Sequence, residues 1–304
     1  MLALPVLNKN FCRTVAFYGR YFITFLCDNL QFEKVRLKYC KTMQNKFYFI
    51  ILLGAFIGCK QKKATPQAGI AISLDDRFVK EWYQLRPLLK KYNAKCTFYI
   101  TQPDSLSDEE VNLLHQLEKG GNEIGCHGAM HVRSMYYIWD FSLEEYMNNE
   151  IFSALKTMRK QGFSPKTFAH PGGSQMWYSD RELLKYFILL RDVSMKTRTL
   201  WNYDYTHEIE EIDEIFYQHD GTQKVNALLI DTSAKLTIED IKKGLKRASE
   251  EGSIMMMFGH KPLMKSTQKE NEYGFDIKFL EQILAESAKL NLKTYTMQQL
   301  PNSQ

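Results

Sequence analysis

Cysteine is scarce in most of this 304-residue chain. Four of the six cysteines lie within the first 59 residues, and only Cys96 and Cys126 follow them, each inside an apolar run. Two cysteines cannot form a dense disulfide framework, so a disulfide-stabilised scaffold is excluded. We expect two buried free thiols, with one disulfide as the alternative in an oxidising compartment.

Residues 60–304 also have no excess of charge of either sign. Residues 1–59 hold eight Lys/Arg and two Asp/Glu, whereas the remainder holds 32 basic and 33 acidic residues, so the net charge of +5 arises in the N-terminal part. A nearly neutral body gives no electrostatic reason to expect a nucleic-acid partner. Hydrophobic residues at 44% and aromatics at 13% indicate a globular protein.

The N-terminal apolar run is shorter than a transmembrane helix. Phe47–Gly58 spans 12 residues, follows Lys46 and precedes Cys59, which is the layout of a secretory signal. Ile57-Gly58-Cys59 resembles a bacterial lipobox, in which Cys59 becomes the lipidated first residue. The resemblance implies a secreted protein, anchored by lipid to a bacterial membrane in the periplasm or at the cell surface. The alternative is a membrane-anchoring or buried helix.

The chain divides into unequal parts. Residues 1–42 fit no pattern, and Met43 is the candidate initiator because a signal normally begins a chain. Residues 43–59 form the expected signal and 60–68 a linker. Residues 69–299 are expected to form one catalytic domain, since they contain no internal repeat or low-complexity tract.

Strand-like and helix-like segments alternate through this domain. We expect strands at 69–76, 94–100, 123–126, 167–170, 187–193, 225–231, 252–259 and 292–297. We expect helices at 78–92, 106–119, 142–161, 180–186, 237–251 and 275–290. Seven or eight such units predict a closed α/β barrel, with an open doubly wound sheet as the alternative. Residues 200–223 break the rhythm and are expected to form an excursion on the barrel rim.

Polar residues gather where the expected strands end, which is where α/β barrels place their chemistry. His127 and His131 are four residues apart, and a helical turn between them would direct both imidazoles at one divalent metal. Unlike H-E-x-x-H, the pair encloses no Glu, so the base and third ligand must come from elsewhere. The other strand-end residues are Asp75, Asp76, His170, Asp192, Asp231 and His260.

Four short stretches resemble those of the NodB-type polysaccharide deacetylases, carbohydrate esterase family 4. Residues 73–76 (SLDD) are similar to the family's T-F-D-D, and 127–131 (HGAMH) to its H-[ST]-x-x-H, with Gly128 replacing Ser or Thr. Residues 168–173 (FAHPGG) are similar to R-P-P-Y-G, and 258–260 (FGH) to L-x-H. The stretches follow the family's order between residues 69 and 297, and the resemblance implies a distorted (β/α)7 barrel.

The resemblance also implies roles for individual residues. Asp75 would be the general base, His260 the general acid and Asp231 its orienting partner, and the Gly172 N–H would bind the oxyanion. A divalent metal, in the first place Zn²⁺, would be held by Asp76, His127 and His131. The chain departs from the family at Ala169, where Arg is usual, at Gly172, where an aromatic is usual, and in DTSAKLT (231–237), which lacks Trp.

The implied activity is hydrolysis of a carbon–nitrogen bond. The enzyme would remove acetyl groups from an N-acetylated amino sugar in a polysaccharide or oligosaccharide. Two alternatives stay open: an esterase for O-acetylated glycans such as xylan, and a carbohydrate-binding lipoprotein without turnover. His170 is equally a substrate contact or a structural residue. Candidates for stacking on sugar rings, or for packing, are Tyr136, Tyr137, Trp139, Trp177 and Tyr178.

Overall fold

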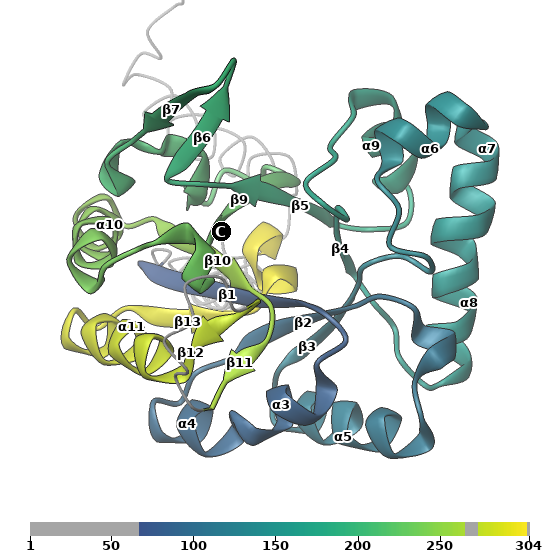
Figure 1. The fold of residues 1–304 in the computed structure, drawn as a ribbon. Helices are drawn as coiled ribbons and strands as arrows, with labels where there is room; N and C mark the ends of the chain where they lie inside the picture. Colours follow the sequence, from purple (N-terminus) through teal and green to yellow (C-terminus); the bar gives the residue numbers. More distant parts are fainter. Residues whose placement is uncertain (1–66, 265–272, 303–304) are drawn as a thin grey trace, which may run out of the picture. The chain divides into compact units, whose positions relative to one another are not determined.

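The strand β1 (Gly69–Asp76) belongs to a sheet that closes on itself to form a barrel (Figure 1). Its residues pair with one neighbour on one side and with the last barrel strand on the other, and all pairings around the ring are parallel. In ring order the other strands are β2 (Cys96–Ile100), β3 (Glu123–Cys126), β4 (Thr167–Ala169), β5 (Leu189–Ser194), β9 (Lys224–Leu229) and β10 (Ile254–Gly259). The predicted seven-stranded barrel is therefore confirmed, and the open sheet is wrong.

The barrel is uneven around its circumference. β3 and β4 are joined through the single pair Cys126↔Phe168, whereas β5 and β9 pair over five positions. Two short strands extend the sheet outside the ring: β13 (Lys293–Tyr295) runs parallel to the start of β1, and β8 (Phe216–Tyr217) antiparallel to β10.

This computed structural model describes residues 67–264 and 273–302. They belong to one compact unit, Ala64–Gln304. The predicted extension (1–42), the signal (43–59) and most of the linker (60–68) lie outside the described residues. Within the described part of the chain, no helix combines the length and apolar character needed to cross a membrane.

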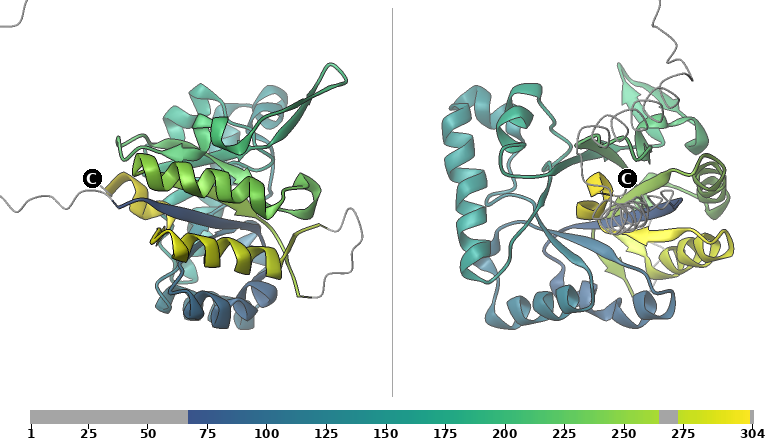
Figure 2. Two further views of the ribbon diagram at one scale, coloured as in Figure 1. Left: turned by 90° about the vertical axis from the view of Figure 1, so that its left-hand side faces the viewer. Right: turned by 180° about the vertical axis from the view of Figure 1, so that it is seen from behind.

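Helices surround the barrel on its outer side (Figures 1 and 2). The capping box predicted at Ser107 and Glu110 is present at the start of α5 (Asp108–Lys119). The predicted helix 78–92 is instead two helices, α3 (Val79–Gln84) and α4 (Arg86–Lys91), because Pro87 begins a new first turn. The remaining long helices are α8 (Ser153–Lys160), α10 (Ile238–Glu251) and α11 (Ile277–Lys289).

Four features of the loops that follow the barrel strands were not predicted. A short helix, α6 (Ser134–Asp140), follows β3, and the expected helix 142–161 contains α7 (Leu143–Tyr146) and the π-helical segment η2 (Met147–Phe152) before α8. α9 (Trp177–Leu183) begins three residues before the expected helix. The rim excursion contains an antiparallel hairpin, β6 (Thr197–Leu200) and β7 (Tyr203–Thr206).

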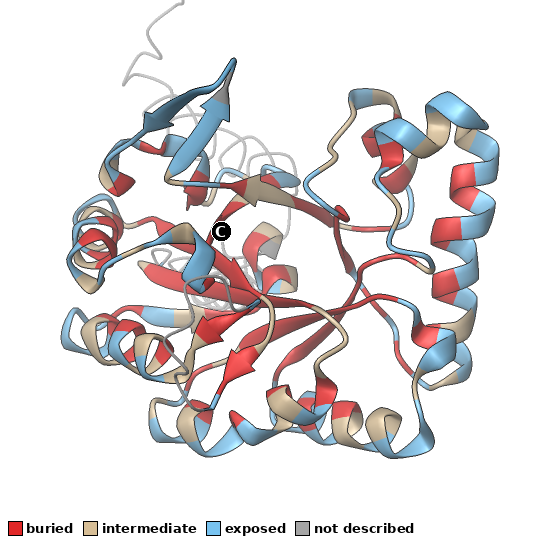
Figure 3. Ribbon diagram, viewed as in Figure 1, coloured by how far each residue is buried: buried red, intermediate tan, exposed pale blue. Residues whose placement is uncertain are grey.

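The barrel strands are mostly buried (Figure 3). Alternation along them sorts their side chains into two layers. On β1, Ile70, Ile72 and Leu74 pack toward the helices, whereas Ala71 belongs to the barrel interior. The same alternation turns Asp75 inward. The short helix η6 (Met297–Asn302) contributes Met297 and Leu300 to that interior layer.

Candidate active site

Three side chains from distant parts of the sequence meet at the mouth of the barrel. Asp76 ends β1, His127 directly follows β3, and His131 lies in the next loop. One ligand atom from each lies within 4.8 Å of the other two. The Asp76 Oδ1 is 3.3 Å from His131 Nε2 and 3.8 Å from His127 Nε2. The structure thus brings together the three residues that the sequence suggested as metal ligands.

The two histidines converge by a route that differs from the prediction. Residues 127–133 form a loop and not a helical turn. Gly128 has φ +84° and His131 has φ +61°, and these left-handed residues turn the chain back so that the two imidazole centroids lie 4.8 Å apart. The expected helical spacing was therefore wrong, although the convergence it was meant to explain is present.

His127 is held in the form that binds a metal. Its buried Nδ1–H donates to the Ala169 carbonyl oxygen at 2.9 Å, which leaves the Nε2 lone pair directed toward Asp76. Burial holds the pKa of His127 well below its usual value, and the charges of His131 and Arg191 act in the same direction. One carboxylate and two imidazole nitrogens form a donor set that fits Zn²⁺ and other first-row divalent ions.

Asp75 has a partner that the sequence reading missed. Arg191, on β5, is fully buried and its Nη2 donates to Asp75 Oδ2. The guanidinium carbon lies 5.3 Å from the Tyr99 ring centroid and 4.6 Å from that of Phe258. Arg191 is also the cross-strand partner of Ala169, the position at which the family pattern has its Arg.

His260 and Asp231 form the predicted pair. The His260 Nδ1 lies 2.6 Å from Asp231 Oδ2, and the His260 backbone N–H donates to Asp231 Oδ1 at 3.1 Å. Burial alone lowers the pKa of His260, but the Asp231 hydrogen bond and the nearby carboxylates outweigh it and leave this pKa above its usual value. The Tyr273 ring lies tilted against His260, with the two centroids 4.7 Å apart, and its hydroxyl donates to Asp76 Oδ2 at 2.6 Å. This contact was not predicted from the sequence.

Comparison with protein families matches residues 62–186 to the polysaccharide deacetylase family. Over these residues, which make up less than half of the chain, the sequence is similar to that of the polysaccharide deacetylase family. The matched region contains Asp75, Asp76, His127, His131 and Gly172, as the motif resemblance predicted. No curated protein matches the chain.

Several solved structures are similar to this one but share little sequence with the chain. A peptidoglycan deacetylase, PdaC from Bacillus subtilis, is 18% identical, with a TM-score of 0.47 over 78% of this chain and 91% of that one. The Xyl-CE4 domain of a multidomain xylanase from the hindgut metagenome of Trinervitermes trinervoides is 14% identical, with a TM-score of 0.49 over 77% and 89%. A family 4 carbohydrate esterase from Streptomyces lividans is 12% identical, with a TM-score of 0.45 over 75% and 91%.

Gly172 lies in the turn after β4, at the position where the polysaccharide deacetylase family usually has an aromatic residue. Its φ is +60°, and a Cβ added there would lie 2.4 Å from Arg133 Nε. The Arg133 side chain therefore occupies the space that a larger residue would need. Among the described residues, no hydrogen bond or ion pair joins Gly172 to the three candidate ligands, and its oxyanion role stays a prediction.

The remaining candidates divide by exposure. His170 is buried, with its Nε2 3.3 Å from the buried Asp180 Oδ1 on α9, which favours the structural alternative. Trp139 and Trp177 are 86% and 75% exposed on helices that follow β3 and β4. They remain candidates for stacking on a sugar, because little protein surface covers them. Cys96 and Cys126 are buried free thiols, as expected.

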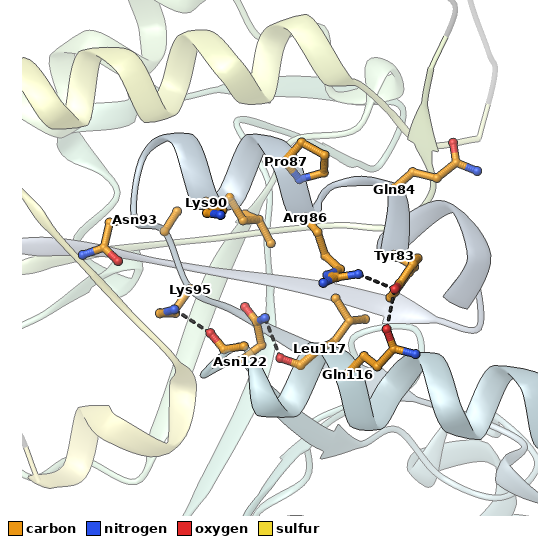
Figure 4. A pocket seen from close by; sticks show the side chains of 13 residues that line it. Tyr83, Gln84, Arg86, Pro87, Lys90, Asn93, Lys95, Gln116, Leu117 and Asn122 are labelled. Atoms are coloured by element: carbon orange, nitrogen blue, oxygen red, sulfur yellow. Dashed lines mark hydrogen bonds between the residues drawn. The ribbon is translucent and has the colours of Figure 1, made fainter.

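A cavity lies away from these residues. It has a volume of about 840 Å³ and opens beside α4 and the end of α5 (Figure 4). Tyr83, Arg86, Lys90 and Lys95 line its edge, and the Lys95 Nζ is bonded to the Gly120 carbonyl oxygen. None of the candidate catalytic residues lines it.

Proposed function

We propose that this protein is a metal-dependent hydrolase that removes acetyl groups from an N-acetylated amino sugar in a polysaccharide or oligosaccharide. The observation that carries the proposal is the convergence of Asp76, His127 and His131 within 4.8 Å, beside a buried carboxylate at Asp75. The family assignment supports the same class of reaction.

Asp75 is suited to act as the general base. A divalent metal, Zn²⁺ in the first place, would polarise the acetyl carbonyl and lower the pKa of the attacking water. Asp75 lies next to a ligand but directs Oδ2 to Arg191, and its buried Oδ1 has no hydrogen-bond partner among the described residues. That oxygen can accept the proton of the water.

His260 is suited to act as the general acid. An amine is a poor leaving group unless its nitrogen is protonated. The raised pKa of His260 keeps its imidazole protonated to higher pH, and Asp231 on Nδ1 leaves Nε2–H free to donate. A Gly172 N–H directed at the oxyanion would contribute about 3 kcal/mol of transition-state stabilisation.

A carbohydrate-binding protein without turnover is the second candidate. Ala169 and Gly172 replace residues that are usual in the family's third stretch, and this observation favours it. An O-acetyl esterase for xylan-type glycans uses the same residues with an alkoxide leaving group.

Acetate release and metal content separate these functions. Protein beginning at residue 60 is assayed on N-acetylated oligosaccharides and on acetylated xylan, with zinc measured by mass spectrometry. Acetate from the N-acetylated substrates alone is expected. Acetate from xylan alone supports the esterase, and one zinc per chain with no acetate from any glycan supports the binder.

We further propose that the protein is exported and anchored through lipid on Cys59. The support is the sequence of residues 43–59. Metabolic labelling with an alkyne fatty acid in a bacterial host is expected to label the full chain and not Cys59→Ala. Equal labelling of both would contradict the anchor.

A further inference from the structure

Glu150 is a fully buried carboxylate that lies beneath the loop carrying His131. Its Oε2 accepts the Met130 N–H at 2.6 Å and its Oε1 accepts the Val132 N–H at 3.1 Å. These two amides flank His131. The Glu150 backbone oxygen also accepts the Ala129 N–H at 3.0 Å, so three backbone amides of the loop donate hydrogen bonds to Glu150.

Gly128 makes room for this carboxylate. A Cβ added to Gly128 would lie 2.0 Å from Glu150 Oε1 and 2.6 Å from Cδ. Its φ of +84° also disfavours any larger residue. The replacement of the family's Ser or Thr by Gly128 and the presence of Glu150 therefore form one structural unit, in which a carboxylate fills the space beside the loop.

Glu150 is buried without a cationic partner, and burial raises its pKa to about 7 although backbone N–H groups act in the opposite direction. Within the described part of the chain, no Lys, Arg or His forms an ion pair with Glu150, and the hydrogen bonds to its side chain come from backbone N–H groups. Burying a carboxylate without a cation is costly unless several N–H groups are directed at it. Glu150 also lies in the π-helical segment η2, and such segments occur often at functional sites.

We infer that Glu150 is a positioning residue for His131, which fixes the loop so that the His131 Nε2 faces Asp76 and His127. The inference rests on the proposed metal site. Glu150 acts on the site through backbone amides and does not itself touch the ligands' side-chain nitrogens.

Zinc affinity of the purified protein tests the inference. Glu150→Gln keeps the size of the side chain but turns an N–H₂ toward the loop amides, and we expect zinc to bind 10- to 100-fold more weakly, as for other residues that orient metal ligands. The matched control is Glu144→Gln, an exposed residue of α7, which should bind zinc like wild type. Wild-type affinity in Glu150→Gln would overturn the inference.

A second pair of variants separates positioning from general destabilisation. Glu150→Ala should lose zinc affinity, and Gly128→Ser combined with Glu150→Ala should regain part of it, because a hydroxyl then fills the same space. If the double variant regains no zinc affinity, Gly128 and Glu150 do not form one structural unit.

If Glu150→Gln does not fold, Gly128→Ala tests the inference instead, because its methyl group displaces the carboxylate. Weaker zinc binding with a cooperative melt supports the inference, and unchanged zinc binding overturns it.

A measurement on metal-free protein distinguishes failure of the proposed metal site from failure of the proposed role of Glu150. Amide hydrogen exchange at Met130 and Val132 in metal-free protein should accelerate in Glu150→Gln and not in Glu144→Gln. If wild type binds no zinc, the proposed metal site fails, and the exchange result still shows whether Glu150 holds the loop. If wild type binds zinc and Glu150→Gln matches it, only the role of Glu150 fails.

Discussion

Buried carboxylates at the two ends of the barrel differ in how completely they are hydrogen-bonded. At the end opposite the candidate ligands, the buried Glu123 accepts hydrogen bonds from the Thr97 hydroxyl at 2.8 Å, the Thr167 hydroxyl at 2.6 Å and the Gln298 N–H at 2.8 Å. The first residue of β3 is thereby tied to β2, β4 and η6. Both oxygens of this carboxylate accept hydrogen bonds from the protein, and we interpret it as structural.

At the mouth of the barrel, several buried polar atoms could still form a hydrogen bond. Asp75 Oδ1 and the Nε and Nη1 of Arg191 have no hydrogen-bond partner among the described residues, although both residues are buried. Native proteins rarely leave such atoms unpaired unless they have a function. Burial alone therefore does not distinguish Asp75 from Glu123; the difference is that Asp75 keeps an acceptor without a hydrogen-bond partner beside the candidate metal ligands.

The largest expected effect is at Asp75. Asp75→Asn preserves size but removes the base, so kcat for acetate release should fall by about 10²–10⁴-fold. Metal content should stay near wild type, because Asp75 is not one of the three ligands. Loss of zinc along with activity would count against the base assignment.

Arg191 should come next. Arg191→Ala leaves Asp75 buried without its cation, and we expect a loss of about 3–5 kcal/mol in the free energy of unfolding and about 10²-fold in kcat as the base moves. Because Ala169 is the cross-strand partner of Arg191, Ala169→Arg in the Arg191→Ala background should restore part of both. Full activity in Arg191→Ala would show that Asp75 needs no such partner.

Asp231→Asn should give a smaller change, seen mainly in the pH profile. The Asp231 hydrogen bond and charge raise the pKa of His260 against the effect of burial. The acid must be protonated, so activity is lost as pH rises through this pKa. Removing the charge lowers the pKa, and the basic limb of kcat should move to lower pH. A shift to higher pH would contradict the pairing.

Glu123→Gln should have the smallest effect on activity. The amide reproduces one acceptor but turns an N–H₂ toward hydroxyl and N–H donors, which should lower the free energy of unfolding by about 1–3 kcal/mol. Acetate release per folded molecule should not change. A drop in kcat without a drop in stability would erase the contrast between the two ends.

Much of this organisation could be read from the sequence. β1 and β3 have the predicted limits because each is an apolar run bounded by polar or glycine residues, and the capping box at Ser107 fixed the start of α5. The three candidate ligands were implied by the motif resemblance. Their position at strand ends agrees with it, since parallel strands in a barrel bring those ends to one mouth.

The features that could not be predicted from the sequence depend on contacts between distant parts of the chain. Arg191 reads as one charge in an apolar strand until the register places it opposite Ala169. Glu150 lies in a π-helical segment, which shifts its direction from that expected for a regular helix. The break before α4 was foreseeable from Pro87, and the β6–β7 hairpin from its alternating residues around Trp201-Asn202.

The central claim is that Asp76, His127 and His131 share one cation. A crystal structure of the protein with zinc added tests it most directly. The account predicts a single zinc, bound to one Asp76 oxygen and to the Nε2 atoms of both histidines at about 2.0–2.2 Å. Zinc bound at other residues, or an Asp76 carboxylate more than about 5 Å from the imidazoles, would contradict it.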